Sequence, residues 1–397
     1  MINKPQIDVE RDNLLTDFGK EVLRDRYMLP TEKSPQEAFA RAAAAFADSD
    51  AHAKRLYDYS SKLWFMFATP ILSNGGTDRG LPISCFLNYV PDSREGLSEH
   101  YAENIWLSSS GGGIGGYWGD IRSQDQSTSK GNKTTGVIPF MHVVDSQMVA
   151  FNQGATRRGS YASYMDISHP EIIEFIEMRK PSGGDVNRKN LNLHHGINVS
   201  DKFMKALEKD ESWKLIDPHN KKVIREVKAR QLWIKILETR VSTGEPYIMF
   251  SDTVNKGLPK ELKAKGLKVH HSNLCSEITL PTNPDRTAVC CLSSVNLEYY
   301  DEWKDDTHFI DDLMRMLDNV LTYFIKHAPA HLWRAVASAK AERSVGLGAM
   351  GFHSYLQRKG VGFNSPMSYD INKNIFKHIH DKALESNFAL GKVRGEP

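Results

Sequence analysis

Short strand-like segments alternate with amphipathic helices from Thr69 to the end of the chain, and this alternation narrows the possible folds more than any other property. Residues 81–90 and 287–300 are apolar, strand-like runs, whereas residues 311–327 and 372–393 have the spacing of amphipathic helices. Strands that alternate with helices predict an α/β protein, and we expect a barrel-like arrangement. We find no repeat with a period of about 20 to 50 residues that would mark a solenoid.

A helical region is predicted to precede this alternating part. We place it at residues 1–68 and the α/β region at residues 69–397. The sequence SPQE at residues 34–37 is a capping box with a proline at the first helical position, so it predicts the start of a helix. A second amphipathic stretch is predicted to continue as a helix to Phe67, with its aromatic residues packing in the core.

Composition excludes several classes of protein. Hydrophobic residues make up 40% of the 397 residues and charged residues 25%, as is typical of a globular protein. The 51 basic and 49 acidic residues are well mixed, so we expect no nucleic-acid partner and only a small nucleotide, if any. The N-terminus lacks an apolar signal segment, and no run of about eighteen apolar residues occurs, so we expect neither a secreted nor a membrane protein.

The cysteines are few and unevenly placed: Cys85, Cys275, Cys290 and Cys291. A disulfide scaffold needs many more, so we predict a reducing cytoplasm. A zinc site is disfavoured because no C-x-x-C spacing is present and two of the cysteines are adjacent. We therefore expect redox or nucleophilic chemistry rather than a structural role.

The stretch NLCSEITLP, residues 273–281, places a cysteine between an asparagine and a glutamate. If it is a strand, side chains alternate with a period of two, and Asn273, Cys275 and Glu277 share one face. Such a polar face points into a cavity or into solvent, which suggests a functional site rather than part of the core. The alternative is that Cys275 is a small apolar residue on a half-buried strand.

Three further segments carry structural predictions. The glycine cluster GGGIGG at residues 111–116 looks like a dinucleotide-binding turn but follows a helix, so we reject that interpretation. Ser168 is predicted to cap the next helix, with Glu171 completing the motif S-x-x-E. The basic stretch at residues 218–230 is predicted to be the solvated face of a helix.

Four features of the sequence together resemble the large (α) subunit of class I ribonucleotide reductase. They are residues 273–281, the run AVCCLSSVNL at 288–297, the strand LPISCFLNYV with an acid seven residues after its cysteine, and the loop NQGATRRG at 152–159. The resemblance extends over about residues 13 to 397. It implies part of a ten-stranded α/β barrel preceded by the helical region.

The resemblance implies a role for each residue of the candidate catalytic site. Cys275 would be the transient thiyl radical that abstracts the 3′ hydrogen of ribose. Glu277 would take the proton of the 3′-OH as general base, and Asn273 would hold the 2′-OH that leaves as water. Cys85 and Cys290 would supply two electrons and close a disulfide at each turnover.

Other implied roles are less central. Cys291, next to the second redox cysteine, would be a bystander. Thr69 and Ser84 would contact the phosphate or ribose of the substrate. Tyr299 and Tyr300 follow the second cysteine strand directly and do not match the tyrosine pair of the family, so we interpret them as structural.

An effector site is implied as well, where ATP or a deoxynucleotide selects the base to be reduced. Asp92 would hold the effector ribose and Arg122 the effector phosphate, which a guanidinium binds well. Gln153, Arg157 and Arg158 would lie between effector and substrate and couple the two sites.

The family features missing from the sequence imply partners. The N-terminal ATP cone is absent, so we expect no shut-off by dATP there. The family continues past Pro397, so we expect a complementing C-terminal polypeptide, with a split gene, an intein or intron, or a fragment as explanations. The resemblance also implies an α homodimer, a ribonucleoside diphosphate substrate, thioredoxin or glutaredoxin as reductant, and a metal-containing small subunit as the radical source. No metal is expected in this chain.

Three alternatives remain open. An adenosylcobalamin-dependent reductase shares the cysteine triad, but its thiyl motif resembles NPCGE rather than NLCSE. A catalytically silent, nucleotide-binding regulatory subunit would not need the complete set of cysteines. A cysteine hydrolase needs a histidine beside its nucleophile, and His270 and His271 lie just upstream of Cys275 without an evident orienting partner.

Overall fold

The computed structural model describes residues 2–151 and 159–395. The chain divides into two compact units, and each is described separately. The first unit comprises Met1–Ser84, Cys290–Ala328 and Ala339–Pro397, and the second comprises Cys85–Val289 and Pro329–Ser338. Within the described residues, no helix is long and apolar enough to cross a membrane.

The first unit is mainly helical, and strand β9 is the centre of its sheet. β9 pairs antiparallel with β1 and parallel with β10. The elements are η1 (Val9–Leu14), α1 (Asp17–Arg26), α2 (Pro35–Ala45), α3 (Asp50–Ser61), β1 (Phe65–Phe67), α4 (Thr69–Asn74), β9 (Ala288–Asn296), η3 (Leu297–Tyr299), α12 (Tyr300–Trp303), α13 (Phe309–His327), β10 (Val345–Met350), α15 (Phe352–Arg358) and α16 (Pro366–Arg394). β9 and α14 (Trp333–Glu342) each contain a boundary between the units.

The N-terminal helical region is confirmed, with one correction at its end. The capping box forms as predicted, and α2 begins at Pro35. The prediction of a continuous helix to Phe67 is wrong, because α3 ends at Ser61 and Leu63 adopts a φ of 61°. Residues 65–67 instead pair with β9. Phe65 and Phe67 are buried there with ring centroids 4.9 Å apart, so tertiary pairing outweighs the local helical pattern.

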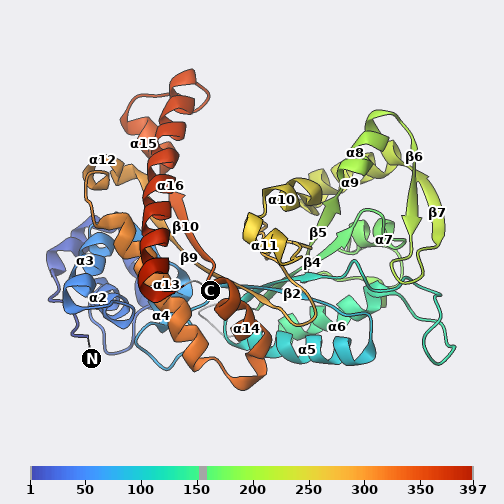
Figure 1. Cartoon of the computed structure of the whole chain (residues 1–397), viewed down its shortest axis with the longest axis horizontal. Helices are drawn as coiled ribbons and strands as arrows, with labels where there is room; N and C mark the ends of the chain where they lie inside the picture. The colour runs from blue at the N-terminus through green and yellow to red at the C-terminus, as the bar shows by residue number, and fades with distance from the viewer. Residues whose placement is uncertain (1, 152–158, 396–397) are drawn as a thin grey trace. The chain divides into compact units, whose positions relative to one another are not determined.

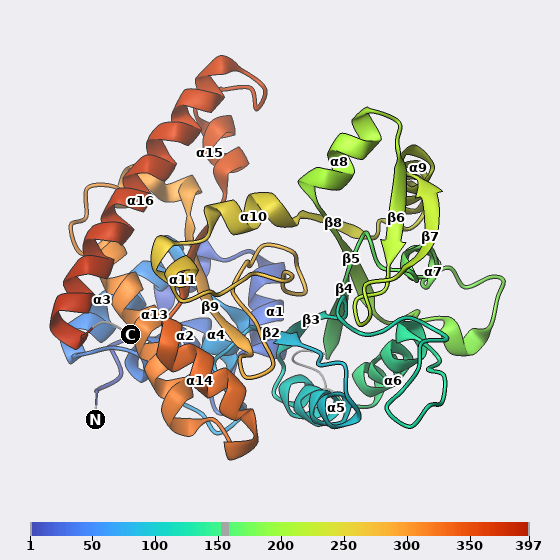
Figure 2. The same ribbon diagram turned by 45° about the vertical axis from the view of Figure 1, so that its right-hand side comes forward.

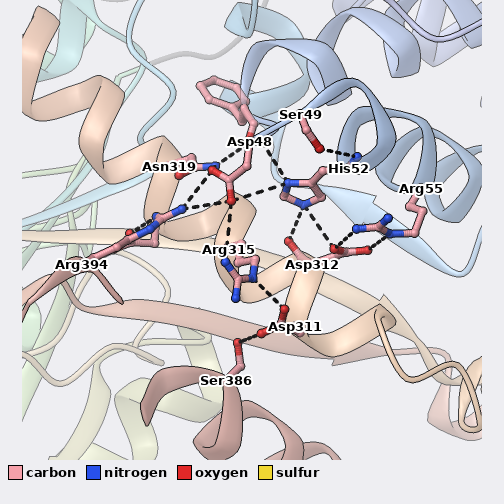
Figure 3. Close-up of polar contacts among 12 residues, drawn as sticks. Asp48, Ser49, His52, Arg55, Asp311, Asp312, Arg315, Asn319, Ser386 and Arg394 are labelled. Carbon is pink, nitrogen blue, oxygen red and sulfur yellow. Dashed lines mark hydrogen bonds and ion pairs between the residues drawn. The ribbon is translucent and has the colours of Figure 1, made fainter. Parts of the chain in front are cut away.

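A buried carboxylate joins α3 to α13 in the first unit (Figure 3). Arg55 forms a two-pronged ion pair with Asp312, with Nε–Oδ2 and Nη2–Oδ1 distances of 2.6 and 2.8 Å. Tyr59 donates its hydroxyl to Oδ2 at 3.1 Å. His52 accepts the backbone N–H of Asp48 at Nδ1 and donates from Nε2 to the backbone carbonyl of Asp312. The Asp312 side chain is therefore fully paired.

The same network reaches α16, which lies beside α13 (Figures 1 and 3). Ser386 donates to Asp311 at 2.7 Å. Arg394 binds Asp48 at 3.0 Å and also pairs with Asp318. Polar and charged side chains thus hold the long C-terminal helix against α13 and against the connection between α2 and α3.

The second unit contains a parallel sheet in the order β2-β3-β4-β5-β8. α5 and α6 lie side by side along it (Figures 1 and 2). The elements are β2 (Cys85–Tyr89), α5 (Arg94–Ser109), β3 (Gly113–Tyr117), α6 (Val137–Ala150), β4 (Ser160–Asp166), α7 (Ile172–Glu177), η2 (Val186–Arg188), β5 (His194–Val199), α8 (Asp201–Glu208), β6 (Ser212–Ile216), β7 (Val223–Lys228), α9 (Ala229–Thr243), β8 (Tyr247–Phe250), α10 (Ser251–Gly257), α11 (Lys260–Ala264) and η4 (Ala330–Leu332). The predicted α/β class is confirmed.

The glycine cluster forms strand β3 rather than a phosphate-binding turn. A side chain at Gly116 would collide with the hydroxyl of Tyr161, because a Cβ there would lie 1.6 Å from it. A Cβ at Gly115 would lie 2.2 Å from the backbone oxygen of Ser272. The glycines therefore allow neighbouring groups to approach the strand closely.

The basic stretch at residues 218–230 was predicted to be a helix face, and this prediction is wrong. It forms the turn and second strand of an antiparallel hairpin, β6–β7, which packs beside α8 and α9 (Figure 2). Lys221 in the turn has a φ of 61°. The apolar residues of β7 do not alternate, so the pairing with β6, rather than a local pattern, makes this stretch a strand.

The predicted helix cap at Ser168 is also wrong. Helix α7 begins at Ile172 without a side-chain cap. The Glu171 carboxylate instead accepts the backbone N–H groups of Gln124 at 3.1 Å and Val137 at 3.0 Å, and pairs with Arg188 at 3.0 Å. Burial raises the pKa of this carboxyl, and the three donors counteract that effect. Glu171 thus joins both ends of the segment 124–137.

Candidate functional site

The segment NLCSEITLP is not a strand, which corrects the prediction made from its alternating pattern. It forms an irregular loop with a turn, in which the N–H of Ser276 donates to the carbonyl of Asn273 at 3.3 Å. Ser276 lies in the left-handed region with a φ of 69°. Asn273 therefore does not share one exposed face with the other two: it is buried, whereas Cys275 and Glu277 are exposed.

The turn nevertheless brings Asn273 and Glu277 together. The Asn273 amide donates from Nδ2 to Oε1 of Glu277 at 2.9 Å. Its Oδ1 accepts the backbone N–H groups of Glu277 and Ile278, both at 3.1 Å. An exposed thiol, Cys275, thus lies on a turn closed by an amide and a carboxylate, groups that bind and deprotonate hydroxyls.

Buried contacts hold this turn against strand β3. His271 donates from Nε2 to the carbonyl of Gly115 at 3.0 Å, and the close approach needs the missing side chain of that glycine. The Tyr164 hydroxyl donates to the backbone oxygen of Asn273 at 2.7 Å. Ser272 donates to the carbonyl of Ile278 at 2.7 Å. The loop is irregular, but hydrogen bonds to β3 and β4 fix its path.

Tyr247, at the start of β8, is a neighbour that sequence reasoning missed. Burial raises the pKa of its phenol, and electrostatic interactions with Glu245 and Cys275 raise it further. Tyr247 is therefore close enough to Cys275 and Glu277 to interact with them electrostatically. No sequence motif links this tyrosine to the cysteine, because they are 28 residues apart.

The other predicted substrate-site residues are distributed over both units. Cys85 begins β2 in the second unit and Cys290 lies in β9 of the first, and both are buried. Their pairing stays a prediction. Thr69 begins α4, and its Oγ1 lies 3.2 Å from the hydroxyl oxygen of Tyr27. Ser84 is buried and is the last residue of the first segment of the first unit, Met1–Ser84.

Cys291 occupies a protected position on β9. Its thiol donates to the carbonyl of Leu317 at 3.4 Å, and burial raises its pKa well above the usual value. Because successive residues of a strand point to opposite faces, Cys290 and Cys291 face different surroundings. The thiol of Cys291 therefore stays protonated, which agrees with the prediction that this cysteine takes no part in the redox chemistry.

Two of the predicted effector residues, Asp92 and Arg122, form an ion pair. They follow β2 and β3, and these neighbouring strands are parallel, so both carboxyl ends lie at one edge of the sheet. Arg122 Nε donates to Oδ1 and Oδ2 of Asp92 at 3.1 and 2.9 Å. Nη1 donates to the carbonyl of Ser127 at 2.7 Å. The Arg122 side chain is 17% exposed and the Asp92 side chain is 21% exposed, so solvent reaches both.

The remaining predicted effector residues, Gln153, Arg157 and Arg158, lie outside the described residues. Among residues 2–151 and 159–395, no group of three or more His, Cys, Asp or Glu side chains is arranged to hold a metal ion.

Two protein-family models match the chain. One is described as the barrel domain of ribonucleotide reductase and matches residues 83–397. The other is described as the all-alpha domain of ribonucleotide reductase and matches residues 13–80. Together they account for nearly the whole sequence.

Individual proteins agree with these models. A protein of Frog virus 3 (isolate Goorha), provisionally named ribonucleoside-diphosphate reductase large subunit, is 54% identical over 87% of this chain and 60% of its own length. The large subunit of Invertebrate iridescent virus 3 is 45% identical over 98% of this chain and 69% of its own length. The class Id ribonucleotide reductase alpha subunit of Actinobacillus ureae superposes with a TM-score of 0.85 and 33% identity, over 99% of this chain and 70% of that chain. This chain thus spans 60 to 70% of the length of these three proteins.

Proposed function

Because the chain belongs to the large-subunit family of ribonucleotide reductases, we propose that it carries the thiyl-radical and effector-binding parts of a ribonucleoside-diphosphate reductase. The observation that supports this most is the turn that joins the Asn273 amide to the Glu277 carboxylate around the exposed Cys275. An amide, a carboxylate and a thiol on one turn match the chemistry that ribose reduction needs.

In the proposed reaction the Cys275 thiyl radical takes the 3′ hydrogen atom of the substrate ribose and becomes a thiol. The Glu277 carboxylate accepts the proton of the 3′-OH. The Asn273 amide binds the 2′-OH, which leaves as water after it gains a proton. Return of the hydrogen atom to C3′ at the end regenerates the thiyl radical, so Cys275 is unchanged over the cycle.

The two electrons come from a dithiol formed by Cys85 and Cys290. Their thiols deliver two electrons and two protons to the sugar and close a disulfide bond. Thioredoxin or glutaredoxin would then reduce that disulfide, which fits a cytoplasmic reaction. A small subunit containing a metal would supply the radical to Cys275.

Asp92 and Arg122 are proposed to bind the effector, ATP or a deoxynucleoside triphosphate. The effector ribose would hydrogen-bond to the Asp92 carboxylate and its phosphates to the Arg122 guanidinium. Both side chains are partly exposed at one edge of the parallel sheet, which supports this assignment. Gln153, Arg157 and Arg158 would couple this site to the substrate.

We also propose an α homodimer and a requirement for the rest of the family's length. Apolar side chains are exposed on the two neighbouring helices beside the sheet, among them Trp106 on α5 and Val143 on α6, and they suit a second copy. The matched relatives are longer than the part that this chain matches. We therefore expect full activity only when that remaining part is present, as a continuation or as a separate polypeptide.

The decisive experiment measures CDP reduction with the small subunit, dithiothreitol and ATP, with and without a polypeptide covering the remaining family length. We expect turnover with the complement and none for Cys275→Ser, while Cys291→Ser keeps most of the activity. If the complemented protein binds ATP but never reduces CDP, the chain is a silent regulatory subunit and the proposed catalysis is wrong.

A further inference from the structure

The turn of the β6–β7 hairpin reaches the proposed effector site. Asp217 follows β6 directly and is fully buried. Its Oδ2 accepts the backbone N–H of Ser123 at 2.8 Å and the hydroxyl of Ser123 at 2.7 Å. Its Oδ1 accepts the N–H groups of His219 and Asn220, both at 3.0 Å. One carboxylate therefore ties the turn to the residue that follows Arg122.

This carboxylate remains ionised despite its position. Burial alone would raise the pKa of Asp217, but the hydrogen bonds from Ser123, Asn220 and His219 outweigh it and hold the pKa below its usual value. A charged carboxylate accepts such bonds more strongly than a neutral group. The link between the hairpin and the Arg122 segment is therefore strong.

Two further contacts extend the link. Asn220 donates from Nδ2 to Oε1 of Gln126 at 2.7 Å, beside the Ser127 carbonyl that Arg122 binds. His219 Nδ1 lies 3.4 Å from Oδ2 of Asp92, the oxygen that also receives Arg122 Nε at 2.9 Å. The Asp92 carboxylate thus has Arg122 and His219 as neighbours, on two different elements of the unit.

We propose that the β6–β7 turn is a third part of the effector site, with Asp217 positioning Arg122 and His219 holding Asp92. This inference rests on the proposed effector role of Asp92 and Arg122. Asp217 fixes Ser123, and with it the backbone on which the Arg122 guanidinium is presented to the phosphates. His219 stays beside Asp92 when Arg122 turns toward phosphate, so the carboxylate keeps its orientation toward the effector ribose.

The exposed fractions agree with these two roles. Asp217 is buried and cannot touch a ligand, so it acts through the segment that it holds. The His219 side chain is 49% exposed and lies at the surface of the pair, where a bound nucleotide can reach it. The hairpin turn therefore contributes one supporting residue and one residue at the site itself.

The test is binding of dTTP to the full chain by isothermal titration calorimetry, followed through two double-mutant cycles. Asp217→Asn is combined with Arg122→Gln, and His219→Ala with Asp92→Asn. We expect each single substitution at the hairpin to weaken binding about tenfold, the size of one lost charge-assisted hydrogen bond. In the Arg122→Gln or Asp92→Asn background the same substitution should change binding less than about twofold, because it acts through the residue already removed.

Matched variants separate this role from general damage. Asp210→Asn breaks an exposed ion pair with Arg230 just before the same hairpin and should leave dTTP binding unchanged. His219→Asn places an amide donor where Nδ1 lies and should therefore keep most of the affinity for dTTP that His219→Ala loses. His219→Gln places its amide where Nε2 lies and should not keep it.

The binding measurements distinguish failure of the hairpin inference from failure of the proposed effector site. If Asp92→Asn and Arg122→Gln weaken binding but the hairpin variants do not, the inference is wrong and the effector site stands. Additive effects in both cycles also overturn the inference, since they indicate a general structural role. If the parent chain does not bind dTTP, or Asp92→Asn and Arg122→Gln leave binding unchanged, the proposed effector site is wrong and the inference fails with it.

Discussion

An aspartate lies between an arginine and a histidine in each unit, and the two clusters differ in how completely the aspartate is enclosed. In the first unit Asp312 is 2% exposed and meets Arg55 and His52. In the second unit Asp92 is 21% exposed and meets Arg122 and His219. These two clusters place the same residue types in the interior and at a surface edge.

The geometry of the arginine explains the difference. Arg55 uses two nitrogens on the two oxygens of Asp312, and Tyr59 adds a third donor. Arg122 uses only Nε on Asp92 and directs Nη1 to a backbone carbonyl. A saturated pair holds helices together, whereas a pair that leaves donors and solvent access can exchange partners with a ligand.

The largest expected effect is on the enclosed cluster. Asp312→Ala leaves Arg55 and Tyr59 without their shared acceptor and should lower the free energy of unfolding by about 3–5 kcal/mol, as is typical for breaking a buried pair. Urea unfolding measures it, with the exposed Asp305→Ala as control. A loss below about 1 kcal/mol would show that the enclosed cluster is no more important for stability than a surface pair.

The next effect concerns the support of the cysteine turn in the second unit. Gly115→Ala places a methyl group against the backbone of Ser272 and should cost about 1–3 kcal/mol through overpacking. It should also abolish most CDP reduction in the complemented assay, because residues 272–277 must move. Gly257→Ala has open space around its Cβ and serves as the control. Unchanged turnover of Gly115→Ala would mean that the turn does not depend on β3.

A smaller effect is the pH dependence of stability caused by His52. Burial lowers the pKa of this histidine, and the nearby Asp312 and Asp48 oppose the shift, while Arg55 adds to it. The unfolded chain therefore binds a proton that the folded chain does not, so stability should fall as pH drops below the unfolded pKa of about 6.5, by at most about 1.4 kcal/mol per pH unit.

Urea unfolding at several pH values between 7 and 5 checks this expectation. His52→Gln should reduce the slope of unfolding free energy against pH, whatever its effect on stability at pH 7. An identical slope in the variant would assign the acid sensitivity to other groups, such as the buried His271, whose pKa burial lowers to about 3.

The smallest effect on stability is expected at the accessible pair. Asp92→Asn should change the free energy of unfolding by less than about 1 kcal/mol, since partly exposed ion pairs contribute little. The same variant should weaken dTTP binding, which Asp312→Asn should affect only through unfolding. If Asp92→Asn destabilised the chain as much as Asp312→Ala, the contrast between the two clusters would disappear.

Elements with strong local signals could be predicted from the sequence. The capping box began α2, the apolar runs formed β2 and β9, and the amphipathic pattern at 311–327 formed α13. Two of the wrong predictions share a physical cause, which is a partner distant in the sequence. Residues 65–67 became a strand because β9 accepts them, and residues 273–281 became a turn because β3 and β4 hold them.

The candidate site divides in the same way. The amino-acid sequence by itself determined the family and the chemical groups. These groups are a thiol, an amide and a carboxylate on one short segment, an acid that follows a cysteine-bearing strand, and an arginine that follows a glycine-rich strand. Only the tertiary structure decided that Asn273 and Glu277 meet through a turn, that Tyr247 neighbours Cys275, and that Asp217 and His219 reach the Asp92–Arg122 pair. Local patterns encode residue chemistry and backbone preference, whereas contacts across about 100 residues depend on how the whole unit packs.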